Sequence, residues 1–424
     1  MTRKIKTFFF VLLCMIIMQG SLPLQAEAKK EADSPTAEFQ KFLYALQLIC
    51  QHYVDPEKVS YRNLFKLALQ GLLKELDPYC SYETEEVFNR TKEEDRGEKV
   101  GIGVFVTMRL GSLEVLATDP ESPAEEAGLK PGDMIRIING EPVNGKQLEE
   151  AGRLLQGNPG ELVTIQIYRP STDKHIDLTI ERKKLRIRSV TGAKILDRTS
   201  GTGYLRITQF NQHTVEDLDK ALTELNKQAL QQLVIDLRGN PGGLVLAAVQ
   251  TCSRFLPPGK TVVSLIGRNE KVLQHFTSEA CKINLQNIPV VLLVNGSTAS
   301  AAEIMTACLQ DYKRAVVIGE QTFGKGVVQN LIPFGNKEAI RLTTAWYSSP
   351  AEQMIQGKGI TPDIIIALSP ARRFALAGQL NHHPGEIQPQ LRNAVRDIQL
   401  ERAIEVLKAV KLFRESHSSE QKSK

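Results

Sequence analysis

The chain of 424 residues has few of the residues that form disulfide frameworks or metal motifs. Cys14 lies in an apolar run near the N-terminus, and the other five cysteines are Cys50, Cys80, Cys252, Cys281 and Cys308. These last five, an odd number at scattered spacings, exclude a disulfide framework and a zinc motif. The formal net charge of +5 is too balanced to indicate a nucleic-acid partner. A chain of this length predicts two or three domains.

A hydrophobic run long enough to cross a membrane is also lacking. The apolar run from Thr7 to Met18 is too short for a stable span. Three basic residues precede it and an A-x-A site, Ala26-Glu27-Ala28, follows it, which is the pattern of a secretory signal. We expect residues 1–28 to be removed near Ala28, which leaves 50 basic and 47 acidic residues and a net charge of +3. Because Cys14 lies inside the apolar run, lipoprotein attachment is not expected.

Residues 29–96 are predicted to form a helical region. Apolar residues recur at helical spacing in FQKFLYALQLICQHYV (39–54) and YRNLFKLALQGLLKEL (61–76), and Pro78 breaks the pattern. An ordinary helical hairpin and a hydrophobic arm that pairs with another subunit both fit this pattern.

Residues 97–185 read as a small β-rich α+β module of strands around one helix, KQLEEAGRLLQ. With Gly101-Ile102-Gly103-Val104 followed by AGLKPGDMIRIING, the module resembles a PDZ domain. The resemblance implies that the backbone N–H groups of Ile102, Gly103 and Val104 bind the terminal carboxylate of a peptide that adds as a strand. The alternative is a β-rich domain without a ligand.

Residues 190–365 alternate strands and helices, which predicts an α/β core. Within it, the turn from Arg238 to Gly243 (RGNPGG) ends a buried strand and opens a helix, where backbone N–H groups are left free. The turn lacks the residues of a P-loop and the spacing of a dinucleotide fingerprint. The remaining interpretation is an oxyanion hole, made by the N–H of Gly242 or Gly243 together with that of Ala301.

A second strand–turn–helix unit places Ser300 between the strand IPVVLLV and the helix AAEIMTACLQ. None of the seven histidines falls within this stretch or the next, so the candidate base for Ser300 is Lys325, between Gly324 and Gly326. Lysine acts as a base near neutral pH only if its pKa falls by about 3 units, which burial can produce. Phe323, Val327 and Val328 are candidates for an apolar pocket around it.

Both residues also have ordinary interpretations. Ser300-Ala-Ala-Glu303 matches a capping box, in which the serine only caps the helix. A lysine between glycines is usually a solvated loop residue.

The motifs together resemble the carboxyl-terminal processing proteases, the tail-specific S41-type serine peptidases. LDPYCSYET, GYLRITQF, DLRGNPGG, STASAAEI, GEQTFGKGVVQ, LTTAWYSSP, IQGKGITPDI and DIQLERAIEVL occur in the order of that family. The resemblance implies a crotonase/ClpP-like protease core with an inserted PDZ domain and helical N- and C-terminal segments. It further implies that Ser300 is the nucleophile, Lys325 the general base, Gln329 the residue that orients the lysine, and Ala301 with the turn glycines the oxyanion hole.

The sequence thus predicts an exported serine endopeptidase in the bacterial periplasm or cell envelope. It would recognise the free C-terminus of a polypeptide through its PDZ domain and cleave through an acyl-enzyme, without a metal, a cofactor or a nucleic acid. An adaptor or activator protein, peripheral membrane association and a homodimer through the terminal helices are further expectations. The alternatives are a catalytically silent PDZ scaffold and, third, an acyl-CoA hydratase of the crotonase type.

Two departures from the family pattern concern regulation and substrate choice. Gln156 stands where many members carry arginine, so the sequence does not predict whether the PDZ domain controls activity. Trp346, within LTTAWYSSP, stands where the family often has another residue, so a substrate pocket of different shape is expected. The protease core is predicted at 186–368. A linker, the closing helix and a disordered tail are predicted at 369–424, with His382 and His383 in a solvated loop rather than at a metal site.

Overall fold

The computed structural model describes residues 35–119, 121–334, 338–380 and 395–422. The chain divides into two compact units, Met1–Tyr82 and Glu83–Lys424. The predicted signal segment and the pair His382–His383 lie outside the described residues. Within the described part of the chain, every helix is too short or too polar to cross a membrane.

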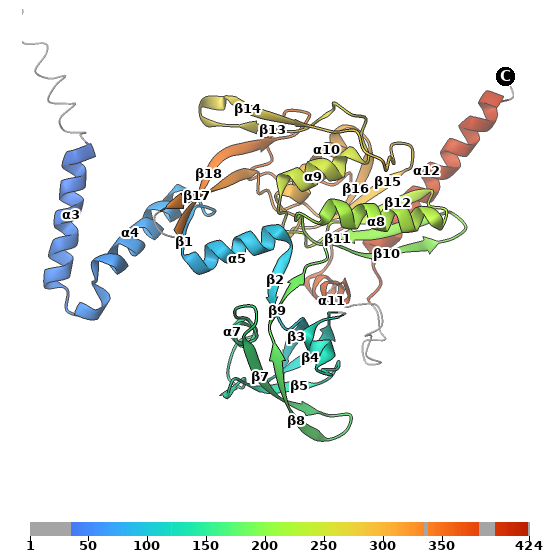
Figure 1. The fold of residues 1–424 in the computed structure, drawn as a ribbon. Helices are drawn as coiled ribbons and strands as arrows, with labels where there is room; N and C mark the ends of the chain where they lie inside the picture. Colours follow the sequence, from blue (N-terminus) through green and yellow to red (C-terminus); the bar gives the residue numbers. More distant parts are fainter. Residues whose placement is uncertain (1–34, 120, 335–337, 381–394, 423–424) are drawn as a thin grey trace, which may run out of the picture. The chain divides into compact units, whose positions relative to one another are not determined.

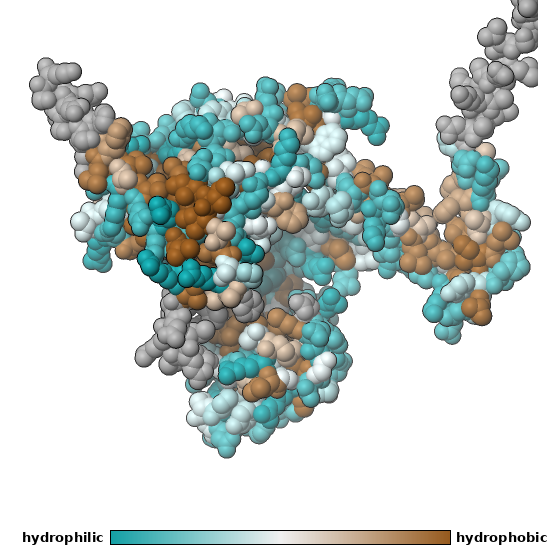
Figure 2. All heavy atoms as spheres, turned by 180° about the vertical axis from the view of Figure 1, so that it is seen from behind, coloured by the Kyte–Doolittle hydropathy of each residue, from teal (hydrophilic) through white to brown (hydrophobic). Residues whose placement is uncertain are grey.

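Residues 35–76 of the first unit, here called the arm, are mainly helical, as predicted. Helix α3 (Pro35–His52) is followed by the 3-10 turn η1 (Pro56–Lys58) and helix α4 (Tyr61–Leu76). The Ser60 side chain caps α4 by accepting the Asn63 N–H. The arm buries few apolar side chains, and hydrophobic residues on its surface alternate with hydrophilic ones, as Figure 2 shows on its right side. The exposed ones include Phe39, Leu43, Tyr44, Tyr53, Val54, Tyr61, Leu72 and Leu76.

The second unit begins at Glu83, the last residue of the short strand β1 (Ser81–Glu83). Helix α5 (Glu85–Arg96) follows and ends at Gly97 in the left-handed conformation that favours glycine. A small β-rich module follows. Its sheet runs in the order β3 (Val104–Arg109), β4 (Ser112–Thr118), β5 (Met134–Ile138), β7 (Leu162–Arg169) and β8 (Lys174–Glu181), and β6 (Glu141–Pro142) pairs with β5. The separate antiparallel pair of β2 (Glu98–Gly101) and β9 (Lys183–Arg186) joins the two ends of the module.

The core of this module follows from the alternation of side chains along its strands. In β7, Val163, Ile165 and Ile167 are buried while the residues between them face outward. They pack with residues of helices α6 (Pro123–Glu126) and α7 (Leu148–Leu155), including Ala124, Ala151 and Leu155. The predicted strands and helix are confirmed.

The larger module is built on a six-stranded sheet (Figure 1). Its order is β10 (Val190–Asp197), β11 (Thr202–Ile207), β12 (Gln232–Asp236), β15 (Val290–Val294), β16 (Ala315–Gly319) and β19 (Ile364–Ile365). From β11 to β19 neighbouring strands are parallel, and only β10 runs antiparallel. The predicted α/β core is therefore confirmed.

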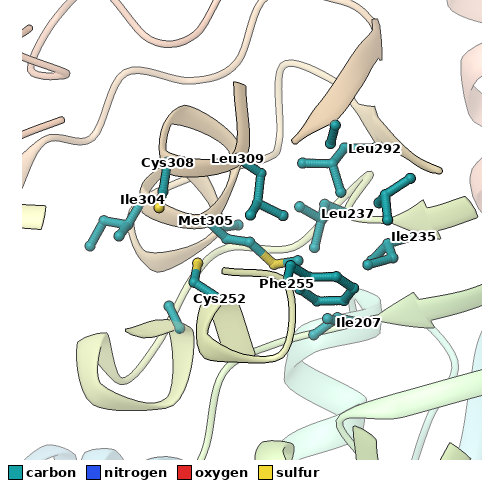
Figure 3. Close-up of a cluster of buried hydrophobic side chains, with 14 of the residues drawn as sticks. Ile207, Ile235, Leu237, Cys252, Phe255, Leu292, Ile304, Met305, Cys308 and Leu309 are labelled. Carbon is teal, nitrogen blue, oxygen red and sulfur yellow. The ribbon is translucent and has the colours of Figure 1, made fainter. Parts of the chain in front are cut away.

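Helices cover both faces of this sheet, which explains why its strands are almost continuously apolar. On one face Leu233, Ile235 and Leu292 pack with α8 (Thr214–Lys227), α9 (Val245–Ser253) and α10 (Ala301–Asp311). Figure 3 shows part of this cluster. On the other face, alternate residues such as Val234 and Leu293 pack against α12 (Ile398–Lys422).

A second, antiparallel sheet contains the hairpin of β17 (Val327–Phe334) and β18 (Glu338–Ser348) and the hairpin of β13 (Thr261–Ile266) and β14 (Val272–Thr277). β18 pairs with β13 and so joins the two hairpins. The 3-10 turn η2 (Arg268–Glu270) connects β13 to β14.

The C-terminal prediction needs two corrections. Residues predicted as a linker begin with helix α11 (Pro370–Leu380), and α12 continues to Lys422 through the segment predicted as a disordered tail. The helix formers in RRFALAGQL and the Glu, Gln and Lys residues of the tail have favourable helix propensities, which stabilise a helix even without apolar periodicity. The predicted closing helix itself is confirmed.

Candidate active site

Three turns that carry the predicted site residues follow three neighbouring strands. β12 pairs with β15 and β15 pairs with β16, all parallel, with Asp236 opposite Leu293 and Val294 opposite Gly319. Since parallel strands end at the same edge of a sheet, the turns after β12, β15 and β16 meet there. These turns hold the glycines of RGNPGG, Ser300 and Lys325.

Ser300 has backbone angles that a non-glycine residue rarely adopts, φ 55° and ψ −120°. Such a conformation costs of order 1–3 kcal/mol and persists only where the surroundings impose it. A strained serine at a sharp strand-to-helix turn is the geometry that presents a nucleophile above a sheet. The capping-box pattern is also present, and in it Glu303 accepts the backbone N–H of Ser300. Because this bond uses the backbone of Ser300 and not its hydroxyl, it does not exclude a role as nucleophile.

Glu303 connects the turn that holds Ser300, residues 295–300 (the serine turn), to the segment that holds Lys325, residues 320–326 (the lysine loop). Its carboxylate is fully buried and accepts four hydrogen bonds. Oε2 accepts the N–H groups of Ser300 (2.8 Å) and Lys325 (2.9 Å), and Oε1 accepts the Gly324 N–H (2.7 Å) and the Thr322 hydroxyl (2.6 Å). The backbone nitrogens of Ser300 and Lys325 are therefore no farther apart than the two Oε2 distances added together. The sequence analysis assigned no such role to Glu303.

The lysine loop packs tightly against the segment Ile355–Gly359. A Cβ atom on Gly326 would lie 2.2 Å from the Gln356 nitrogen, so only glycine fits there. Gln356 Oε1 in turn accepts the Gly326 N–H at 2.8 Å. Glycine at 326 thus lets the backbone of this segment approach the lysine loop closely.

Of the apolar residues expected around Lys325, Val327 is buried and Val328 is half-buried, but Phe323 is 57% exposed. Lys325 itself is half-buried. Gln329 lies in β17, which begins two residues after the lysine, and faces Thr343 of β18. The apolar wall is therefore thinner than the sequence suggested.

The glycine-rich turn lies directly against the serine. A Cβ atom on Gly242 would lie 2.7 Å from Ser300 Cβ and 2.9 Å from the Ala301 nitrogen. The Gly242 N–H donates to Asn240 Oδ1 at 2.8 Å, so the predicted use of Gly242 as an oxyanion donor is not available in this conformation. Neither the Gly243 N–H nor the Ala301 N–H has an acceptor among the described residues. These two groups are the remaining donors at the turn.

Backbone hydrogen bonds fix the glycine turn to the serine turn. The Ala299 N–H donates to the Asn240 carbonyl at 2.9 Å, and the Thr298 hydroxyl donates to the Leu237 carbonyl at 2.9 Å. Thr298 also accepts the Phe323 N–H at 3.0 Å through its own carbonyl. The three turns thus form one bonded unit.

A buried ion cluster lies at the start of the glycine turn. The Arg238 guanidinium donates to both carboxylate oxygens of Asp236, at 2.9 and 2.6 Å, and to both of Asp397 at the start of α12, at 2.9 and 2.8 Å. Burial by itself would raise the pKa of Asp236, but the charge and hydrogen bonds of Arg238 outweigh burial and hold it below its ordinary value. The cluster joins the turn to the C-terminal helix.

The small β-rich module presents the predicted carboxylate loop at an edge. Strand β3 is the edge of its sheet among the described strands, and helix α7 contacts it. The Ile102 carbonyl accepts the Ala124 N–H, and the Gly103 carbonyl accepts the Asp119 N–H, both at 2.8 Å. In the described part of the chain, the N–H groups of Ile102 and Gly103 have no acceptor. An open strand edge beside free N–H groups suits an added peptide strand.

At the end of α7, where Gln156 replaces the expected arginine, a different arginine is present. Arg182 is buried and donates to the carbonyls of Leu154 (3.0 Å) and Leu155 (3.2 Å), the last residues of the helix. It directly precedes β9, the strand that leads out of the module.

Comparison with known proteins supports both modules. Residues 201–366 match peptidase family S41 and residues 114–169 match the PDZ domain. The carboxy-terminal-processing protease of Bartonella bacilliformis is 37% identical over 310 residues, 72% of this chain and 70% of that protein. The carboxy-terminal processing protease CtpB of Bacillus subtilis is 34% identical over 348 residues, 82% of this chain and 71% of that protein.

Among solved structures, an S41 protease from Bacteroides fragilis shares the fold, with a TM-score of 0.55 and 20% identity over 87% of this chain and 97% of that chain. The predicted resemblance is confirmed. The chain therefore belongs to the carboxy-terminal processing proteases, the serine peptidases of family S41 that carry a PDZ domain.

Proposed function

We propose that Ser300 is the nucleophile and Lys325 the general base of this protease. The observation that carries the proposal is the Glu303 carboxylate, which holds the strained Ser300 turn and the Lys325 backbone on one oxygen atom. In the reaction, Ser300 Oγ attacks the scissile carbonyl while the neutral Lys325 amine takes the hydroxyl proton. The N–H groups of Gly243 and Ala301 stabilise the oxyanion that develops.

The same lysine completes the reaction. Lys325 returns its proton to the leaving amine, which breaks the C–N bond and leaves the N-terminal fragment as an ester on Ser300. Water then attacks the ester while Lys325 takes a proton from that water. The lysine gives this proton to Ser300 Oγ as the ester C–O bond breaks, which regenerates the serine hydroxyl and releases the N-terminal fragment as a carboxylic acid. Gln329 orients the lysine amine between these steps. No step requires a metal or another cofactor.

The substrate is a polypeptide that enters with its free C-terminus. In the PDZ domain the terminal carboxylate accepts the N–H groups of Ile102, Gly103 and Val104, and the tail adds as a strand to the edge of β3. Cleavage then occurs upstream of the held tail. A core of the crotonase/ClpP type is supported by its parallel sheet, and domain limits of 29–96, 97–185, 186–368 and 369–424 complete the architecture.

The proposal extends to location and assembly. The basic, apolar and A-x-A segments of residues 1–28 support export to the periplasm or cell envelope. The exposed apolar residues of α3 and α4 support a homodimer, because pairing with a second copy would remove them from water. Peripheral membrane contact and an adaptor or activator are further proposals for the same surfaces. A monomeric mass by light scattering across micromolar concentrations would exclude the dimer.

The experiment that tests this function compares the mature protein with Ser300→Ala on an unstructured polypeptide that ends in small apolar residues. The polypeptide is supplied with a free C-terminal carboxylate and, separately, with a C-terminal amide. We expect wild type to cleave the carboxylate form, to cleave the amide form more slowly, and the variant to cleave neither. Cleavage by Ser300→Ala at the wild-type rate would overturn the assigned nucleophile, and equal rates on both tails would overturn recognition of the terminal carboxylate.

A further inference from the structure

Asn240 is a fully buried asparagine in the glycine turn (RGNPGG), and the mechanism above gives its side chain no role. Its Oδ1 accepts the Gly242 N–H at 2.8 Å, and its Nδ2 donates to the Ile207 carbonyl at 2.9 Å, at the end of β11. Its backbone N–H donates to the Leu237 carbonyl at 3.1 Å, and its own carbonyl accepts the Ala299 N–H at 2.9 Å. A buried amide that is bonded at both ends is held in one orientation.

The bond to Gly242 decides which N–H group of the turn is left for a substrate. The Gly242 N–H is taken up by Asn240, and the Gly242 carbonyl accepts the Phe210 N–H at 2.7 Å. The Leu244 N–H donates to the Phe210 carbonyl at 2.8 Å, so Phe210 and Gly243 pair as in a parallel ladder. In such a ladder the residue between two bonded neighbours turns its own N–H away from the partner. The Gly243 N–H therefore points away from Phe210, and among the described residues it has no acceptor.

The backbone of Asn240 ties the same turn to the nucleophile. Ala299, whose N–H donates to the Asn240 carbonyl, directly precedes Ser300. Gly242 lies so close to the serine turn that a Cβ atom on it would be 2.9 Å from the Ala301 nitrogen. One residue thus bonds both to the turn that carries the first proposed oxyanion donor and to the turn that precedes the second.

We propose that Asn240 is a positioning residue for the stabilisation of the oxyanion. By accepting the Gly242 N–H, its side chain holds the turn so that the Gly243 N–H is the group that donates to the oxyanion, while its carbonyl keeps this donor in register with the Ala301 N–H. Donors that are fixed before the reaction stabilise the developing charge without reorganisation. The inference rests on the proposed function of Ser300, because the oxyanion develops only when this serine attacks the carbonyl.

The test compares Asn240→Ala and Asn240→Ser in the mature protein. Alanine removes the acceptor of the Gly242 N–H, whereas a serine hydroxyl can accept an N–H two residues on, although more weakly than asparagine. We expect kcat per active site to fall about 10- to 100-fold in Asn240→Ala with little change in KM, and Asn240→Ser to recover part of this loss. Active sites are counted from the final amount of a fluorophosphonate label, so that a loss of folded protein does not lower the rate per site.

A peptide aldehyde gives a second readout that a purely structural role would not change. Its adduct with Ser300 places an oxygen at the position of the oxyanion, which the bound substrate does not, so its affinity follows the stabilisation of the transition state. We expect the aldehyde to bind Asn240→Ala more weakly by the same factor by which kcat falls.

Asn211 provides the matched control, because it has the same hydrogen-bond pattern in a different turn. It is also buried, its Oδ1 accepts the His213 N–H at 2.9 Å, and its Nδ2 donates to the Ile187 carbonyl at 3.3 Å. Asn211→Ala should lower the thermal midpoint, as Asn240→Ala does, but keep the wild-type kcat and aldehyde affinity. Equal losses of kcat in the two variants would overturn the inference, because loosening of any buried turn would then explain them.

Wild-type kcat and aldehyde affinity in Asn240→Ala would also overturn the role of Asn240, since the bond to Gly242 would then not direct the oxyanion donor. If Ser300→Ala is inactive while Asn240→Ala is fully active, only this inference fails. If Ser300→Ala still cleaves, the proposed function fails first.

Discussion

Gly242 shows how closely the candidate oxyanion turn approaches the nucleophile. Its φ of 102° lies in the region that favours glycine, and there is no space for a Cβ atom between it and Ser300. Its neighbour Gly243 is equally constrained, since a Cβ atom there would lie 2.0 Å from the Phe210 carbonyl oxygen. Two glycines are needed here for two different contacts.

At this scale we predict that Gly242→Ala abolishes most of the activity. The added methyl group would push against Ser300 Cβ, the Ala299 carbonyl and the Ala301 N–H, so the proposed nucleophile and the proposed oxyanion donor at Ala301 would both move. Loss of oxyanion geometry alone lowers kcat about 100- to 1,000-fold. The measurement is kcat on the polypeptide substrate, with the thermal midpoint recorded in parallel.

Gly259→Ala provides the control, because Gly259 also has a positive φ, 83°, but open space where a Cβ would be. It shares the backbone strain without the collision at Ser300. If both variants lose the same activity, strain in the backbone and not contact with the nucleophile would explain the effect.

At the scale of elements, the Glu303 carboxylate connects helix α10 to the loop before β17 through hydrogen bonds. An ionised carboxylate accepts about four hydrogen bonds, and four donors surround Glu303. A glutamine has one oxygen and two N–H donors, so it leaves at least two of these groups unsatisfied.

We therefore predict that Glu303→Gln separates the serine turn from the lysine loop. Each buried donor left unsatisfied costs about 1–3 kcal/mol, and activity should fall by more than the loss of folded protein explains. The readouts are the urea midpoint and kcat per labelled serine. Glu320→Gln is the control, since Glu320 lies at the start of the same loop but accepts from Leu368 and Arg373. Equal kcat values for Glu303→Gln and wild type would contradict the assigned role.

The cluster of Asp236, Arg238 and Asp397 makes helix α12 part of the same arrangement. The pKa of Asp236 is lower in the folded chain than its ordinary value of 3.8. At a pH between these two pKa values, Asp236 therefore binds a proton in the unfolded chain but not in the folded chain. The stability from Asp236 is fully present above pH 4 and is lost as the pH falls toward the folded pKa.

This cluster gives a pH-dependent prediction for Asp236→Asn. Removing one partner of a buried ion pair costs roughly 3–5 kcal/mol near neutral pH. Measured by urea unfolding from pH 6 to pH 3, the difference between wild type and the variant should be largest above pH 4 and should shrink as the pH falls. A difference that stays constant over this range would show that Asp236 does not carry the charge assigned to it.

For the whole molecule, the sequence was most informative where one segment determines its own structure. The helices of the arm, the strands of both modules and the strand–turn–helix units around RGNPGG and Ser300 follow from local periodicity and turn residues. The order of the motifs also predicted the family. The turns after β12, β15 and β16 meet because these strands are neighbours in the sheet. The order of strands in a sheet cannot be predicted from the sequence of any one segment.

The remaining features depend on groups that are distant in the chain. Glu303 reads as a helix cap in the sequence, and its bonds to Thr322 and Gly324 become visible only in the fold. The Gly242 N–H was predicted as an oxyanion donor because the turn alone does not reveal that Asn240 accepts it.

The most direct test of the Ser300–Lys325 assignment is covalent labelling with a fluorophosphonate, in which the serine oxygen displaces fluoride. We predict a single adduct on Ser300 in the mature wild-type protein, formed faster as the pH rises through the pKa of the base. Lys325→Met should fold, keep Ser300 and react at least 100-fold more slowly, since the base contributes about 10²–10⁴ in rate. An adduct on another residue, or an equal rate in Lys325→Met, would contradict the account.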